Sequence, residues 1–189
     1  MPYRSVKFAA GAYYHLYNRG NNFQPIFFES ENYLYFLRQL RKHLTAEAAE
    51  IIAYCLMPNH YHLLVHLKTD DLSDRMQPFA LAYTKAINKR YGRVGSLFQG
   101  HFKAIHVDRD EYLLHLSRYI HLNSVAAGLS KRPEDWEFSS YSEFVGLRRG
   151  TLPQPAVVLS QFPSPDAYRQ FVETYRAEDR KVLEHLVFD

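Results

Sequence analysis

The sequence predicts an α+β fold built around one antiparallel β-sheet. Three observations support this prediction: segments with strand and helix periodicity alternate between residues 12 and 107, their order is strand, helix, strand, strand, helix, strand, and no internal repeat or low-complexity segment interrupts them. A βαββαβ order builds the ferredoxin-like or RRM-like arrangement, with both helices on one face of the sheet. The other face is left open unless a later helix crosses it.

The first three elements combine aromatic and β-branched strands with one amphipathic helix. Residues 12–21 are rich in aromatics and end in a turn-prone Asn-Arg-Gly-Asn, which predicts a strand and its exit. Residues 30–44 repeat apolar side chains at helical spacing, and Ser30 is a residue type favoured at the N-cap. Residues 50–57 are β-branched and apolar, which predicts a second strand.

The next three elements complete the predicted sheet. Pro58 and Asn59 form a turn that leads into a strand over residues 60–67, so this strand and the one before it should pair as an antiparallel hairpin. Residues 72–91 return to helical spacing. Residues 97–107 have the pattern of a further strand.

The rest of the chain is predicted to be mostly helical. Residues 108–129 show a strong helix pattern, and residues 136–144 form a short packed turn or helix. We expect residues 1–150 to form one domain. Residues 151–189 would follow as a proline-containing linker and an amphipathic C-terminal helix over residues 166–186.

Composition indicates a globular protein with an anionic partner. The chain has 189 residues, of which 47% are hydrophobic and 23% are charged. Residues 1–106 hold 13 Lys/Arg and 7 Asp/Glu, whereas residues 107–189 hold 10 and 13. A basic larger part suits nucleic acid, although this excess alone is a weak signal.

Cysteine usage and hydropathy indicate the compartment. The single cysteine, Cys55, can form no internal disulfide, which favours a reducing cytoplasm. The N-terminus has no signal-peptide pattern, and no apolar run approaches the ~20 residues that span a bilayer. The sequence therefore predicts a cytoplasmic protein that does not involve a membrane.

Two histidines, one residue apart, open the strand over residues 60–67. Alternation points His60 and His62 to one face and the apolar Tyr61 and Leu63 to the other. Because the apolar side chains claim the core, we expect the histidines on the open face of the sheet. Two neutral imidazoles there are good ligands for a divalent metal, and the plainer alternative is a chance His-x-His among 10 histidines.

The helix over residues 108–129 offers two more functional side chains. Tyr119 and Asn123 are four residues apart and so are neighbours on one helical face. The amide oxygen of asparagine is a hard ligand that suits Mg²⁺ or Mn²⁺, and the phenol of tyrosine can be a nucleophile. If this helix covers the open face, all four side chains converge; otherwise Tyr119 is an ordinary core aromatic.

Several segments together resemble the HUH single-tyrosine transposases of the IS200-like family. MPNHYHLLV (57–65) is similar to the H-hydrophobic-H motif of that family, and RYIHLNSVAAGL (118–129) resembles its tyrosine helix. Three further segments resemble the family in the same order: YHLYNRGN (14–21), SLFQGHFKA (96–104) and WEFSSYSEF (136–144). The branch that the chain most resembles is that of the REP-associated tyrosine transposases, which are domesticated relatives of insertion-sequence transposases.

The resemblance implies a role for each matching position. His60 and His62 would bind Mg²⁺ or Mn²⁺, with Asn123 as the third protein ligand. Tyr119 would attack a phosphodiester of single-stranded DNA near hairpin-forming repeats, which gives a 5′-phosphotyrosine and a free 3′-hydroxyl. Residues 1–150 would be the catalytic domain of a bacterial, nucleoid-associated enzyme, either a monomer or a homodimer. The alternative is a catalytically silent, domesticated DNA- or RNA-binding module on the same fold.

Contacts to DNA are less sharply defined by the sequence. Arg19 is the best candidate, because it lies in the matching Asn-Arg-Gly turn. The sequence departs from the family pattern at two positions. Ser124, in the helix over residues 108–129, stands where a proline is usual, and His101 stands where an arginine is common. The side chains that could contact phosphates, or belong to a solvated charged face, are Arg19, Lys85, Lys89, Arg90, Arg93, His101 and Lys103.

Overall fold

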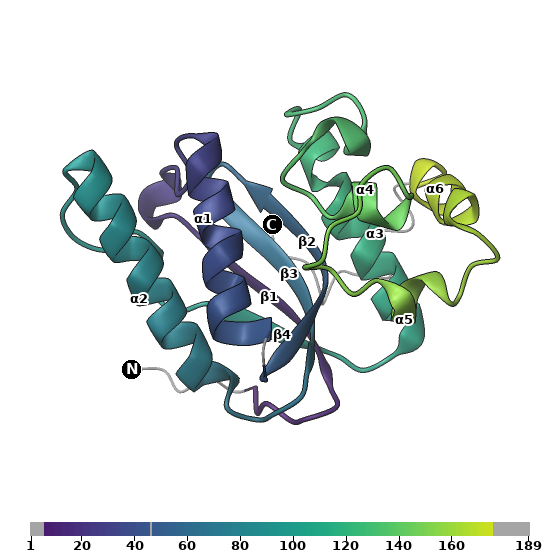
Figure 1. Cartoon of the computed structure of the whole chain (residues 1–189), viewed down its shortest axis with the longest axis horizontal. Helices are drawn as coiled ribbons and strands as arrows, with labels where there is room; N and C mark the ends of the chain where they lie inside the picture. Colours follow the sequence, from purple (N-terminus) through teal and green to yellow (C-terminus); the bar gives the residue numbers. More distant parts are fainter. Residues whose placement is uncertain (1–5, 46, 176–189) are drawn as a thin grey trace.

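The computed structural model describes residues 6–45 and 47–175, and its centre is a four-stranded sheet (Figure 1). The strands are β1 (Tyr13–Arg19), β2 (Ala49–Met57), β3 (His60–Leu67) and β4 (Lys103–Val107). Their order across the sheet is β2-β3-β1-β4, and each neighbouring pair is antiparallel. This is the ferredoxin-like order, so the predicted α+β class is confirmed.

Helices α1 (Ser30–Leu40) and α2 (Leu72–Tyr91) cover one face of this sheet. Figure 1 shows α1 in front of the strands and α2 beside it. The strands present alternate apolar side chains to these helices, for example Leu16 from β1 and Leu63 from β3. Both are fully buried, together with Phe36 of α1 and Phe79 of α2. The histidines of β3 must therefore point to the opposite face.

Helix α3 (Asp110–Ala126) packs on that opposite face and contacts β2 most closely. Its residues Leu116 and Ile120 are fully buried in a second core with Ile52 and Cys55 of β2. Helix α3 is thus the later helix that was expected to cover the otherwise open face of the sheet. Figure 1 shows α3 and the elements after it gathered beside β2, away from α1 and α2.

The elements that follow α3 fasten it in place. They are a 3₁₀ turn (Pro133–Asp135), α4 (Tyr141–Phe144), α5 (Ala156–Leu159) and α6 (Pro165–Glu173). Buried His121 of α3 is hydrogen-bonded through Nδ1 to the Tyr168 hydroxyl of α6 (2.7 Å) and through Nε2 to the Ser140 hydroxyl (2.9 Å). The Ser140 hydroxyl in turn accepts a hydrogen bond from the backbone N–H of Tyr54 in β2 (2.9 Å). One buried chain of polar groups thus joins α6, α3 and the sheet.

The predicted strand over residues 97–107 is wrong in its first part, because β4 begins only at Lys103. Phe98 makes an isolated bridge to Gly20 instead. Gly100 then adopts a positive φ of 74°, which ends extended pairing and turns the chain before β4.

The helices also end differently from their predicted bounds. Helix α1 ends at Leu40, and one π-helical turn over Arg41–Thr45 follows it. At its other end, the N-cap residue is Glu29, which has an extended backbone, and not Ser30. Helix α6 ends at Glu173, short of the predicted 166–186; residues 176–186 lie outside the described part of the chain. Within the described ranges, no helix combines the length and the apolar character needed to cross a membrane.

The buried His121 network predicts a measurable pH dependence of folding. Burial lowers the pKa of His121 to about 3, whereas an unfolded histidine titrates near about 6.5. Below that higher value the unfolded chain binds one more proton, so stability falls as the pH drops. We expect His121→Gln to be less stable at neutral pH but to lose stability on acidification less steeply, by about 1 kcal/mol per pH unit on average between pH 7 and pH 5. Urea unfolding between about pH 7 and pH 5 measures both slopes, and equal slopes would contradict the assignment.

Candidate functional site

The site is built around His60 and His62 on the open face of β3. Their ring centroids are 5.1 Å apart and their planes are nearly perpendicular, at 87°. Both residues line a cavity of about 430 Å³, a volume typical of small-ligand sites. His62 is buried and only 2% exposed, whereas His60 is partly exposed at the end of the strand. The predicted pair is therefore accessible from one cavity.

Each of the two rings is fixed through its Nδ1 atom. The carboxamide oxygen of Asn59 lies 2.7 Å from His60 Nδ1, and because this oxygen can only accept, His60 carries its proton on Nδ1. His62 Nδ1 lies 2.9 Å from Nε2 of His15 in β1. When His62 donates this hydrogen bond, Nε2 is the atom that keeps a lone pair on both rings, which is the arrangement of metal-binding histidines.

Sequence analysis gave His15 no role at this site. The structure buries His15 completely and stacks its ring on His62, with centroids 5.1 Å apart. The predicted strand order would have indicated this position of His15. The βαββαβ order makes β1 and β3 neighbours, and alternation along each strand puts His15 on the same face as His62.

Electrostatics keep the histidine pair neutral. Burial is the main reason that the pKa of His60 is lowered to about 4, and the positive charge of Arg19 lowers it further. Burial also lowers the pKa of His62 well below the ordinary value, and the nearby His15 and His60 add to this shift. Both imidazoles are therefore unprotonated at neutral pH, as a metal ligand must be.

Tyr119 and Asn123 reach the same cavity from α3. The Tyr119 ring meets the His62 ring edge to face, with centroids 5.6 Å apart, and lies 6.4 Å from the ring of His15. The side-chain amide nitrogen of Asn123 donates to the backbone carbonyl of Tyr119 (2.8 Å), so its oxygen Oδ1 is the atom that could bind a cation. All four residues predicted for the chemistry thus come together within one chain.

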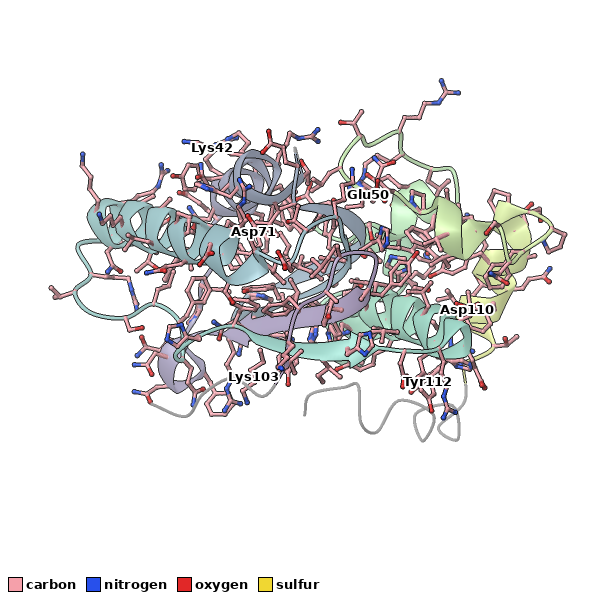
Figure 2. The ribbon with its side chains drawn as sticks, turned by 90° about the horizontal axis from the view of Figure 1, so that it is seen from below. Lys42, Glu50, Asp71, Lys103, Asp110 and Tyr112 are labelled. Atoms are coloured by element: carbon pink, nitrogen blue, oxygen red, sulfur yellow. The ribbon has the colours of Figure 1, made fainter. Side chains whose placement is uncertain are left out.

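Two of the predicted phosphate contacts lie at this site. Arg19 is paired with His60 in the sheet register, donates through Nε to the Gln99 side chain and lines the main cavity. Lys103 is paired with Tyr17 and lines a smaller adjoining cavity together with His60. Figure 2 shows Lys103 on the opposite side of the molecule from Lys42, which follows α1. Arg19 and Lys103 therefore lie on the same face of the sheet as the histidine pair.

The other predicted phosphate contacts lie outside the two cavities. Lys85 and Lys89 are exposed on α2, which covers the other face of the sheet. Arg90 forms an ion pair with Glu29 (2.6 Å), and Arg93 donates to the Gln24 side chain (3.3 Å). His101 is exposed in the turn before β4. The structure brings together only part of the predicted set.

The donor set fits an open divalent-cation site. Two imidazoles that share one ion through bonds of about 2.1 Å place their ring centroids roughly 5 Å apart, which matches the separation of His60 and His62. The described residues contain no cluster of three or more His, Cys, Asp or Glu that could hold a metal. A neutral oxygen such as Oδ1 of Asn123 is thus the candidate third ligand, which would leave positions for substrate oxygens.

The influence of Arg19 on His60 can be tested directly. We expect Arg19→Gln to raise the pKa of His60, because removal of the nearby positive charge favours protonation, while burial still holds the pKa below its ordinary value. An NMR titration of the His60 ring protons gives the pKa. Arg38→Gln is the matched control, since Arg38 pairs with Glu31 on α1. A His60 pKa that stays the same in Arg19→Gln would refute this electrostatic coupling.

Comparison with known proteins agrees with this architecture. The chain is similar to a solved REP-associated tyrosine transposase bound to a REP hairpin, with a TM-score of 0.64 at 20% identity; the match covers 82% of this chain and 97% of the other. No curated protein sequence matches the chain. The sequence model described as "Transposase IS200 like" matches residues 9–123, which is more than half of the chain and includes both histidines, Tyr119 and Asn123. The chain therefore belongs to the IS200-like transposase family.

Proposed function

We propose that this transposase cleaves and rejoins single-stranded DNA in a metal-dependent reaction, with Tyr119 as the nucleophile. The convergence of the Tyr119 ring with His60, His62 and Asn123 in one cavity carries the proposal. The Tyr119 hydroxyl would lose its proton and form a bond to phosphorus, while the bond from phosphorus to the 3′-oxygen breaks and that oxygen takes up a proton. The products would be a 5′-phosphotyrosine and a 3′-hydroxyl.

The covalent link makes the reaction reversible. A phenolate leaves more readily than an alkoxide, because a phenol is the stronger acid. The phosphotyrosine therefore keeps the energy of the broken bond, and a DNA 3′-hydroxyl can attack it to restore a phosphodiester. Such chemistry supports strand transfer, which is what a transposase needs, in place of simple hydrolysis.

His60 Nε2, His62 Nε2 and Asn123 Oδ1 are the atoms that would hold Mg²⁺ or Mn²⁺. When bound, the ion would polarise the phosphate and offset the charge that builds on its oxygens. His15 and Asn59 would hold the two imidazoles in the required tautomers through the Nδ1 contacts of 2.9 and 2.7 Å. Arg19 beside His60 would add a fixed positive charge for the phosphate.

We propose hairpin-forming repeats as the DNA substrate, and the REP-associated branch as the place of this chain within the family. The resemblance of the sequence motifs and the REP hairpin bound by the structurally similar protein support this proposal. Arg19 and Lys103 beside the cavity would contact the cleaved strand. Lys85, Lys89 and Arg93 on α2 and the turn after it would contact a more distant part of the DNA.

We also propose that residues 1–150 form the catalytic domain and that the following segment supports the tyrosine helix. The packing of α6 against α3 favours this division of roles. Tyr168 and Val172 of α6 are fully buried in the core that contains α3. Arg118, the neighbour of Tyr119, donates to the backbone carbonyl of Phe171 (3.1 Å) and stacks over its ring. Helix α6 would thus limit the movement of the nucleophile.

We expect Tyr119→Phe to abolish covalent protein–DNA adducts while leaving DNA binding largely intact, because only the attacking oxygen is removed. Incubation with a single-stranded oligonucleotide that contains a hairpin and Mn²⁺, followed by a denaturing gel, measures the adduct. Tyr112→Phe is the matched control on the same helix and should retain the adduct. Adduct formation by Tyr119→Phe would remove Tyr119 from this role; an unmodified chain that binds DNA without any adduct would indicate a silent binding module.

The loss of Mn²⁺ affinity should be larger when the two ligand histidines are replaced than when only His15, which orients one of them, is replaced. We expect His60→Ala with His62→Ala to lose Mn²⁺ binding, and His15→Ala to weaken it about 10- to 100-fold because the ring of His62 is no longer oriented. Titration calorimetry of the DNA-free protein with Mn²⁺ measures the affinity. His66→Ala is the control, because His66 lies on the same strand face beside Glu50. Unchanged Mn²⁺ affinity in the double variant would contradict the ligand assignment.

A further inference from the structure

A large aromatic side chain stands exposed at the mouth of the cavity. Phe23 belongs to the 3₁₀ turn that follows β1 (Asn21–Phe23) and is 62% exposed. It lines the cavity that also contains His60 and Tyr119. A single exposed apolar ring is common on protein surfaces, but among the exposed large apolar side chains of the described residues Phe23 is the one that lines the cavity of the histidine pair.

The backbone of this turn is held in an unusual conformation. Asn22 and Phe23 have positive φ angles of 51° and 58°, a left-handed region that a bulky residue rarely adopts. The N–H of Phe23 donates to the carbonyl of Gly20 (3.1 Å), and the Asn59 side chain donates to the carbonyl of Phe23 (3.3 Å). A Cβ on Gly20 would collide with the carbonyl oxygen of Gln24, so the turn requires glycine there. The turn therefore fixes where the exposed ring stands.

The guanidinium of Arg19 stacks on the Phe23 ring and lies between this ring and the histidine pair. The guanidinium carbon of Arg19 lies 4.1 Å from the centroid of the Phe23 ring, which is a cation–π contact. Arg19 is itself paired with His60 in the sheet register. The exposed ring, the guanidinium and the proposed metal ligands thus adjoin one another. This arrangement suits one nucleotide, with its base on the ring and its phosphate between Arg19 and the histidines.

We propose that Phe23 is a stacking platform for one unpaired nucleobase whose phosphate lies at His60 and His62. This inference rests on the proposed function and adds to it a binding site for a base. A phenyl ring has no hydrogen-bonding group, so the platform would accept any base and favour purines through their larger stacking area. It would hold the strand in register for Tyr119 without reading its sequence.

The test compares a strand that has bases with one that lacks them. The probes are the single-stranded octamer dA8 and an octamer of abasic deoxyribose phosphate, each bound by the full-length Tyr119→Phe protein with Mg²⁺ and followed by fluorescence anisotropy. We expect Phe23→Ala to weaken dA8 binding about 5- to 150-fold and to leave binding of the abasic octamer unchanged. Phe23→Trp should restore dA8 binding. Leu81→Ala is the control, since Leu81 is similarly exposed (51%) on α2.

The outcomes separate this proposal from the proposed function. Unchanged dA8 binding in Phe23→Ala would overturn the platform, and so would an equal loss for both octamers, because the ring would then support the phosphate site instead of a base. The proposed function would stand in either case if the protein that retains Tyr119 forms a covalent adduct with DNA. If the protein that retains Tyr119 forms no adduct, while Phe23→Ala lowers base-dependent binding in the Tyr119→Phe protein, the platform stands and the nuclease is refuted.

Discussion

The site depends on the packing of α3 against the open face of the sheet. Leu116 and Ile120 are fully buried against β2, and each contributes on the order of 1.5–3 kcal/mol by leaving water. Between them, Tyr119 faces the histidines of β3. A rotation of α3 by one residue would turn each side chain by about 100° and would expose Ile120 while it removed Tyr119 from His62. The apolar packing of the helix therefore sets the position of the phenol.

Around this helix, polar groups are arranged before any ligand arrives. His60 and His62 are each held through Nδ1, and the amide of Asn123 is anchored on the carbonyl of Tyr119. Burial keeps both imidazoles neutral, so no proton has to be displaced at neutral pH before a cation binds. Such preorganisation reduces the reordering needed on binding, which is what a site that holds a phosphate and a phenol in one geometry requires.

Periodicity predicted most of the fold, because the sheet and its helices are each driven by a clear apolar pattern. The strand over 60–67 and the helix over 72–91 have the predicted bounds. The start of β4 was not predictable, since the positive φ of Gly100 and the bridge of Phe98 to Gly20 depend on tertiary contacts. At the site, residue chemistry indicated His60, His62, Tyr119 and Asn123. The place of His15 beside His62 follows from the predicted strand order and could have been inferred. The position of Phe23 depends on the left-handed turn after β1, which periodicity does not predict.

A crystal structure of the protein soaked with Mn²⁺, with data collected at the manganese absorption edge, tests the central claim most directly. The account predicts one anomalous peak bonded to Nε2 of His60, Nε2 of His62 and Oδ1 of Asn123, at distances of about 2.0–2.3 Å, with the Tyr119 hydroxyl on the same side of the cavity. A peak held by other residues, or a histidine pair that binds no manganese at saturating concentration, would contradict it.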